Sequence, residues 1–143
     1  PLRTALRLAP EETKQEVVNI LIDALLAVAI SDFSEGNFRA SIDYLKEALK
    51  LKPQSVKLAN ELINTLIASG RDLLSRGYTT EAINAFNEAI ELSTDNVNAY
   101  LGLAKAYFQK EDILKALSAA GKALEIDPSS KDAQSLLKQL MKY

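Results

Sequence analysis

Two residue types on which much protein chemistry depends, histidine and cysteine, are absent from all 143 residues. Their absence excludes the usual general base near neutral pH, the Ser-His and Cys-His nucleophiles, and metal sites built from imidazole or thiolate. The sequence also contains no phosphate-binding glycine loop and no nucleophile elbow. Paired carboxylates occur at Glu11 and Glu12 and at Glu111 and Asp112, where we expect helix starts or turns that favour negative charge. We therefore expect no enzyme activity, no cofactor and no metal site.

The composition is that of an ordinary globular protein, with 48% hydrophobic and 25% charged residues and a formal net charge of -2. Basic and acidic residues are interspersed, so the chain lacks the electrostatic footprint of a nucleic-acid-binding protein. The longest apolar run, residues 17–30, has 14 residues and includes Asn19 and Asp23, whereas a membrane span needs about 18. This run predicts a buried helix and no membrane span. Without cysteine the compartment stays open, with the cytoplasm slightly favoured.

An internal repeat organises the chain. Residues 81–96 align with residues 115–130 at a shift of 34 positions. The coinciding apolar pairs are Ala82/Ala116, Ile83/Leu117, Ala89/Ala123, Ile90/Leu124 and Leu92/Ile126. An earlier copy lies 41 positions before the first of these and keeps its internal spacing through Ile42, Ala48, Leu49, Leu51 and Pro53. The seven extra residues are nearly two helical turns, so we interpret residues 56–62 as a helix extension that keeps the apolar face in place.

Each copy is expected to form two helices joined by a turn. Apolar residues of the first helix recur at i, i+3, i+4 and i+7, as in Tyr100, Leu103, Ala104 and Tyr107. Gly36 and Gly77 then supply the left-handed conformation that ends a helix, and Glu111 must adopt it without glycine. Pro53 and Pro128 stop the second helix, and Ser55 and Ser129 or Ser130 can cap the next one.

These patterns resemble the tetratricopeptide repeat, a 34-residue helix-turn-helix unit with apolar and small residues at fixed places. The third unit, residues 97–130, carries Tyr100, Leu103, Ala104, Tyr107, Ala116, Ala123 and Pro128 at those places. The second unit, residues 63–96, carries Leu66, Gly70, Leu73, Ala82, Phe86 and Ala89, and the first unit spans residues 22–55. The chain departs from the family pattern at Asp32, Ser41, Ser69 and Thr94, and it lacks tryptophan. The resemblance implies an all-α, right-handed α-solenoid of stacked antiparallel helix hairpins, forming a single domain over residues 1–143.

Both ends carry further patterns. Ala5, Leu6, Leu8 and Pro10 are spaced like residues 48, 49, 51 and 53, so residues 1–21 are interpreted as a partial upstream repeat and a helix extension, in a fragment of a longer protein. The alternative is a frayed arm before a helix that starts at Pro10. Residues 131–143 are interpreted as a capping helix with a polar outer face. Its predicted apolar stripe is Ala133, Leu136, Leu137, Leu140 and Met141.

In the resembled family the first helices line a concave groove, and the matching positions form the predicted peptide-binding site. They are Asp23, Leu26, Ala27, Ile30, Phe33, Asn64, Ile67, Ala68, Arg71, Leu74, Asn98, Leu101, Gly102, Lys105 and Phe108. Members that hold a terminal carboxylate use a cluster of Lys, Asn and Arg, whereas those places hold Leu26, Ile30, Ala68, Asn98 and Gly102 here. The resemblance therefore implies a protein-interaction scaffold for an apolar or amphipathic peptide, with amides and cations available for its backbone or an acidic group. Alternatively, some of the apolar positions only pack between helices.

A second hypothesis concerns the expected first helix. Its apolar residues go nearly all the way round the axis, more than one neighbouring helix could cover, so a further partner is implied. They are Val17, Val18, Ile20, Leu21, Leu25 and Leu26. The partner is an upstream repeat, a peptide, or a second copy of the chain; the last makes the protein a self-assembly element that dimerises through its N-terminal helices. Asp23 is interpreted either as a solvated carboxylate paired with a nearby base or as a ligand anchor.

Overall fold

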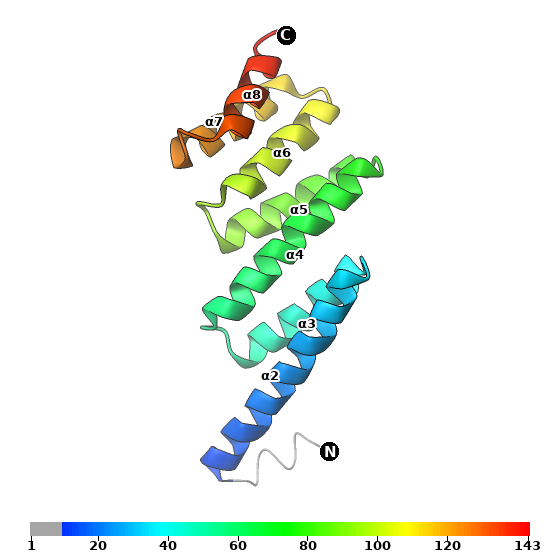
Figure 1. The fold of residues 1–143 in the computed structure, drawn as a ribbon, viewed down its shortest axis with the longest axis vertical. Coiled ribbons are helices and arrows are strands. Elements are labelled where there is room, and N and C mark those ends of the chain that lie inside the picture. The colour runs from blue at the N-terminus through cyan, green and yellow to red at the C-terminus, as the bar shows by residue number, and fades with distance from the viewer. Residues whose placement is uncertain (1–9) are drawn as a thin grey trace. The chain divides into compact units, whose positions relative to one another are not determined.

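The computed structural model describes residues 10–143, which form seven α-helices and no strand (Figure 1). The helices are α2 (Glu11–Ser34), α3 (Phe38–Leu51), α4 (Val56–Ser75), α5 (Thr79–Leu92), α6 (Val97–Gln109), α7 (Ile113–Ile126) and α8 (Lys131–Leu140). Short turns join them, and short connections favour antiparallel neighbours. The predicted tail of an upstream repeat lies mostly in residues 1–9, outside the described residues.

The chain divides into two compact units, Pro1–Leu62 (unit 1) and Ile63–Tyr143 (unit 2). The division falls inside α4, which runs without interruption through 20 residues, whereas α6 has 13. The single domain over residues 1–143 and the proposed repeat boundaries stay predictions.

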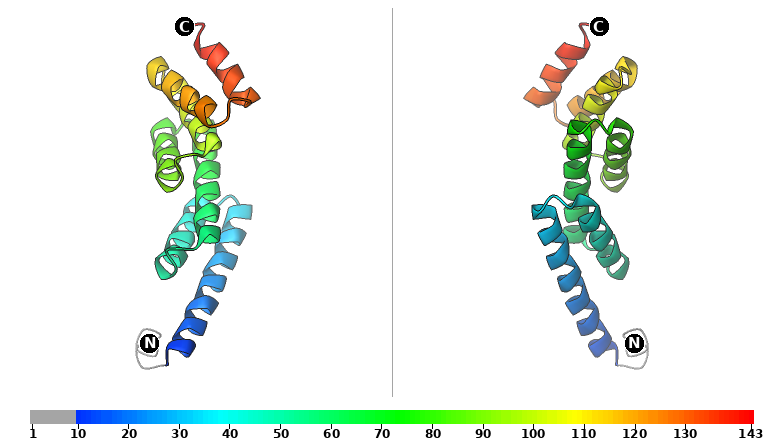
Figure 2. Two further views of the ribbon diagram at one scale, coloured as in Figure 1. Left: turned by 90° about the vertical axis from the view of Figure 1, so that its left-hand side faces the viewer. Right: turned by 90° about the vertical axis from the view of Figure 1, so that its right-hand side faces the viewer.

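In unit 1, α2 packs against α3, and both views of Figure 2 show these helices side by side. The close approach depends on small residues, because Ala29 of α2 and Ser41 and Ala48 of α3 are almost fully buried. Ser41 stands where the family pattern has alanine. Its hydroxyl donates a hydrogen bond of 2.7 Å to the Ala29 carbonyl oxygen, so the buried polar group is satisfied.

In unit 2, the core is centred on Phe86 of α5, which has no exposed surface. Gly70 of α4 and Gly102 of α6 both face its ring, at positions where an added Cβ would come within 3 Å of ring atoms. The two glycines therefore let α4 and α6 approach the same aromatic side chain. α6 also packs against α7, and α7 against α8. Alanines at 104, 116, 120 and 123 are fully buried in these contacts, as expected where helix axes lie close.

The three helix-ending turns have the conformation that the sequence predicts. Gly36 and Gly77 have φ angles of 81° and 86°, and Glu111 has a φ angle of 64° without being glycine. A left-handed residue with a Cβ is strained, so the backbone conformation of the α6–α7 turn is less favourable in free energy than that of the two turns with glycine.

The predicted serine caps are confirmed. Ser55 Oγ accepts a hydrogen bond from the Leu58 N–H at 3.3 Å, and Ser130 Oγ accepts one from the Ala133 N–H at 3.2 Å. These hydroxyls satisfy backbone donors at the starts of α4 and α8 that have no partner within the helix.

The expectation that residues 17–30 form a buried helix is wrong. α2 buries only Ile22, Leu26 and Ala29, and the Ile20 side chain is 68% exposed. The apolar residues surround the helix, as the sequence predicts, but neighbouring helices in unit 1 cover only part of its circumference.

The length of α2 also overturns the sequence-based reason for excluding a membrane span, which counted only the 14-residue apolar run. Among the described residues, α2 is the one helix long and apolar enough to cross a membrane by length and composition. This is a weak indication, because core helices of soluble proteins and N-terminal signal sequences share these features. The absence of a membrane span stays a prediction.

At the C-terminus, α8 has the amphipathic pattern expected of a capping helix. Ala133, Leu136 and Leu140 are buried, and α8 contacts both α6 and α7. Met141, predicted to belong to the apolar stripe, is instead largely exposed, because α8 ends at Leu140 and the chain turns there.

Candidate peptide-binding surface

Five predicted groove residues lie on α2 in unit 1. Ile30 and Phe33 are large apolar side chains that remain 51% and 40% exposed, and Asp23 and Ala27 are also exposed. Leu26 is buried and therefore supports this surface from beneath. Ala27, Ile30 and Phe33 therefore present apolar area to the solvent along one helix.

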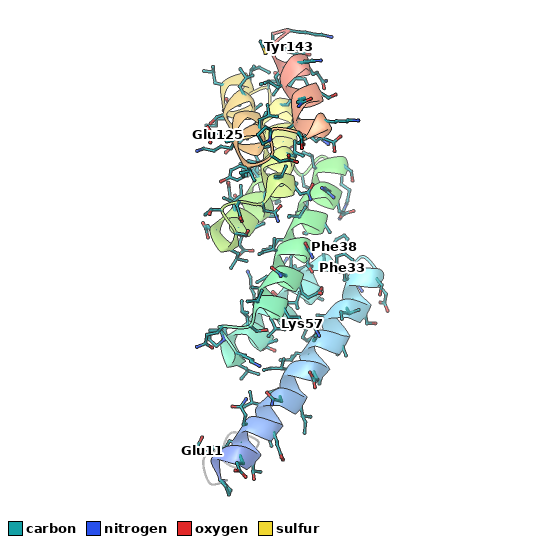
Figure 3. All side chains as sticks on the ribbon, turned by 60° about the vertical axis from the view of Figure 1, so that its left-hand side comes forward. Glu11, Phe33, Phe38, Lys57, Glu125 and Tyr143 are labelled. Carbon is teal, nitrogen blue, oxygen red and sulfur yellow. The ribbon has the colours of Figure 1, made fainter. Side chains whose placement is uncertain are left out.

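Phe33 has a second contact that limits its freedom. Its ring lies 5.4 Å, centroid to centroid, from the ring of Phe38, the first residue of α3, in an edge-to-face arrangement (Figure 3). Such pairs stabilise the structure by about 0.5–1.5 kcal/mol beyond the area that they bury. Phe33 is thus both a candidate binding residue and a link between α2 and α3.

Asp23 borders a pocket of about 330 Å³ in unit 1. The pocket is lined by Asn19, Ile22, Asp23 and Leu26 of α2 and by Lys52, Ser55, Lys57 and Leu58 from the α3–α4 turn and the start of α4. Within residues 10–143 no base hydrogen-bonds or ion-pairs with the Asp23 carboxylate, and both interpretations of this residue stay predictions. Lys52 and Lys57 lie outside the family's groove positions, so the sequence pattern did not indicate them.

Ten of the predicted residues lie in unit 2, on α4 and α6. The structure brings two of them together: Arg71 Nη2 donates a hydrogen bond of 3.3 Å to Asn98 Oδ1, which links the exposed faces of the two helices. Asn64 and Lys105 are also exposed. Ile67 and Leu101 are buried, so for them the alternative interpretation, packing between helices, describes what the structure shows.

Leu74 and Phe108 are half-buried. The Phe108 ring lies 5.5 Å from the ring of Tyr143, the C-terminal residue, again edge to face. No sequence signal indicated this contact, because the two residues lie in different predicted elements and Tyr143 follows the last helix.

The places that hold a terminal carboxylate in the resembled family carry no lysine or arginine here. Gly102, one of them, is buried against Phe86, and Leu26 is buried on α2. Asn98, the single polar residue among these places, already accepts a hydrogen bond from Arg71. Within residues 10–143 no group of three or more Asp or Glu side chains could hold a metal ion.

Comparison with known protein families agrees with the resemblance seen in the sequence. A model described as "TPR repeat" matches residues 70–111, and a model described as "Tetratricopeptide repeat" matches residues 24–55 and 97–130. Together the matched segments make up more than half of the chain. A comparison with curated proteins found no match.

Among solved structures, the chain is similar to the second TPR domain of human RPAP3 in complex with the HSP70 peptide SGPTIEEVD, with 15% identity and a TM-score of 0.58 over 88% of this chain and 99% of that one. It is similar to the Arabidopsis OM64 TPR domain, with 18% identity and a TM-score of 0.61 over 85% and 94% of the two chains. A tetratricopeptide repeat protein from Parabacteroides merdae gives 19% identity and a TM-score of 0.63 over 84% and 45%. These similarities confirm the all-α solenoid fold class predicted from the sequence.

Proposed function

Because this chain belongs to the tetratricopeptide repeat family, we propose that it is a protein-interaction scaffold that binds an apolar or amphipathic peptide segment in its concave groove. Domains of this family are generally non-catalytic interaction modules. The proposal includes the absence of catalysis from this chain, which contains no histidine or cysteine.

The observation that carries the proposal is the exposure of Ile30 and Phe33 on α2. Burial of apolar surface contributes about 25 cal/mol per Å², so large apolar side chains that stay exposed on an ordered helix are suited to a partner's apolar face. A bound amphipathic helix would place its own apolar residues, spaced at i, i+3, i+4 and i+7, against such a surface.

Polar residues of unit 2 fit the same kind of ligand. Arg71 and Asn98 are held together by their hydrogen bond and keep further donors free for a peptide carbonyl or carboxylate. Lys105 is exposed and has no ion pair with any residue between 10 and 143. On unit 2 these groups would hold the backbone or an acidic group of a bound peptide.

The acidic peptide bound by the RPAP3 domain is a poor model for this ligand. The five places that hold a carboxylate in the family carry two large aliphatic residues, an alanine, a glycine and one asparagine here. A carboxylate at those places would lose hydration without gaining a charged partner. The proposal therefore specifies an apolar or amphipathic segment.

The test compares two isoleucines of α2. Peptides of 16 residues would be selected from a displayed library on the full chain, and their affinity measured by fluorescence anisotropy for the wild type, Ile30→Glu and Ile20→Glu. Both side chains are exposed, but ten residues place them about 80° apart around the helix, and only Ile30 belongs to the predicted groove. We expect Ile30→Glu to weaken binding at least tenfold and Ile20→Glu to leave it unchanged. Equal affinities for the wild type and Ile30→Glu would refute the groove.

A second candidate function, self-assembly through α2, is favoured by a different observation. A stripe of uncharged residues runs along the outward side of α2 at alternating spacings of four and three, as in helices that pair along a seam. It consists of Thr13, Val17, Ile20, Ala24, Ala27 and Ser31. Light scattering across a concentration series tests this candidate: a dimer that Ile20→Glu dissociates supports it, and a monomer at all concentrations rejects it.

A further inference from the structure

We infer that the pocket of unit 1 bordered by Asp23 binds an acidic side chain of a peptide together with an adjacent aliphatic side chain. We call it the lysine pocket, defined by Asn19, Ile22, Asp23, Leu26, Lys52, Ser55, Lys57 and Leu58. It lies outside the groove positions of the proposed function except for Asp23 and Leu26, and its ligand chemistry differs from that of the apolar groove.

The pocket exists because α2 and α4 are long. Asn19 and Asp23 lie near the middle of the 24-residue α2, and Lys57 and Leu58 are in the first turn of the 20-residue α4. Figure 3 labels Lys57 at the start of α4, where its side chain borders the same pocket as the α2 residues. Helices of 13 residues, the length of α6, with the same C-terminal ends would still include Asp23 but would lack Asn19, Lys57 and Leu58.

Hydrogen-bond donors dominate the polar part of the pocket. The Asn19 amide oxygen accepts a bond from Gln15 Nε2 at 3.1 Å, which leaves the Asn19 NH₂ group for a ligand. The Ser55 oxygen accepts the Leu58 N–H and keeps its own hydroxyl hydrogen. With the two lysine ammonium groups, the pocket presents four groups that can donate to an anion.

The lysines carry uncompensated charge. No acidic residue in the part of the chain that the structure describes forms an ion pair with Lys52 or Lys57, and Asp23 lines the same pocket without pairing with either. Two cations and one carboxylate leave an excess of one positive charge. A ligand carboxylate therefore gains charge-assisted hydrogen bonds, and the Asp23 carboxylate is left to accept a backbone N–H of the ligand.

The floor of the pocket is apolar. Ile22, Leu26 and Leu58 are all at least nine-tenths buried, and they separate the polar rim from the interior of unit 1. A volume of about 330 Å³ is at the small end of ligand sites and suits two adjacent side chains rather than a cofactor. A ligand with an acidic residue next to a leucine or isoleucine would match both the polar rim and the apolar floor of the pocket.

The experiment uses the isotopically labelled full chain and three capped probes, acetyl-Leu-Glu-Leu-amide, acetyl-Leu-Gln-Leu-amide and acetyl-Leu-Lys-Leu-amide, in NMR titrations at low salt. We expect saturable shifts at the amides of Asn19, Lys52, Ser55 and Lys57 with the glutamate probe. Affinity for the neutral glutamine probe should be about fivefold lower, as expected for the loss of partly exposed charge-assisted bonds.

Two variants and a control test whether the pocket lysines bind the glutamate side chain. Lys52→Gln and Lys57→Gln should each weaken the glutamate probe about three- to fivefold and leave the glutamine probe unchanged. The matched control is Lys50→Gln, an exposed lysine of α3 that does not line the pocket, and it should have no effect. Equal binding of the glutamate and glutamine probes, preference for the lysine probe, or shifts confined to other residues would overturn the inference.

The titration of the lysine pocket and the binding test of the groove can succeed or fail independently of each other. Ile30 does not line the lysine pocket, so Ile30→Glu should leave the shifts caused by the glutamate probe intact. Failure of the groove test together with a positive probe titration would leave the lysine pocket standing, and the reverse pair of results would leave the groove standing.

Discussion

Gly102→Ala should destabilise unit 2 strongly, because its new methyl group has no space. A Cβ built at Gly102 lies 2.2 Å from Cε1, 2.4 Å from Cζ and 2.7 Å from Cδ1 of Phe86. Carbon atoms in contact are normally about 3.5–4.0 Å apart, so the ring or α6 must move by more than about 1 Å.

The ring cannot move away easily. Phe86 is fully buried, and a Cβ at Gly70 would also lie only 2.7 Å from its Cε1, so α4 and α6 both pack tightly on this side chain. Overpacking of a core costs about 1–3 kcal/mol, and we expect the upper end here. The higher helix propensity of alanine offsets about 1 kcal/mol of this cost. The free energy of unfolding should therefore fall by about 2 kcal/mol.

Gly121→Ala is the matched control. Gly121 lies in α7, and a Cβ there meets nothing within 4 Å, so the substitution should raise stability by about 0.5–1 kcal/mol through helix propensity alone. Urea unfolding followed by circular dichroism measures both free energies. In thermal melts each kcal/mol corresponds to about 4 °C for a protein of this size.

A double variant tests the cause. Phe86→Leu shortens the side chain that blocks the methyl group, so Gly102→Ala should cost at least about 1 kcal/mol less in the Phe86→Leu background than alone. Additive losses, or a Gly102→Ala variant within about 0.5 kcal/mol of the wild type, would show that the contact between α6 and Phe86 is not tight.

The remaining predictions concern single positions. Glu111→Gly should raise stability by about 1 kcal/mol in urea unfolding, because it relieves a left-handed residue with φ of 64°; an unchanged midpoint would contradict the strain. Ser41→Ala should lower stability by less than about 1 kcal/mol, because the Ala29 carbonyl loses the hydroxyl bond but keeps its bond within α2; a larger loss would show that the bond stabilises the α2–α3 contact more than this. In the binding assay, Ile30→Glu and not Ile20→Glu should weaken peptide binding at least tenfold, and the opposite order would place the peptide on the Ile20 side of α2 instead of in the groove.

The repeat pattern predicted much of the fold because its signals are local. A left-handed turn residue, a serine cap and a proline stop act within a few residues of themselves, so Gly36, Glu111, Ser55 and Ser130 could be interpreted without knowing their neighbours in space. The apolar periodicity likewise depends on helix geometry alone.

The candidate site was predicted less completely. The predicted groove set includes Ile30 and Phe33, which the structure leaves exposed, but it also includes Ile67 and Leu101, which are buried. The contact between Phe108 and Tyr143 joins residues 35 positions apart. The lysine pocket combines residues from α2, a turn and α4. Residue spacing along one helix cannot predict which residues of other elements lie beside it.

The sequence by itself determined the helical repeats, their turns and caps, and the absence of histidine and cysteine chemistry, since each follows from residue type and short-range spacing. Only the tertiary structure decided that α2 keeps much of its apolar surface exposed, that Phe86 lies against two glycines, and that Lys52 and Lys57 share a pocket with Asp23. Burial and convergence depend on how helices distant in sequence pack, and periodicity within one helix specifies a face but not the neighbour that covers it.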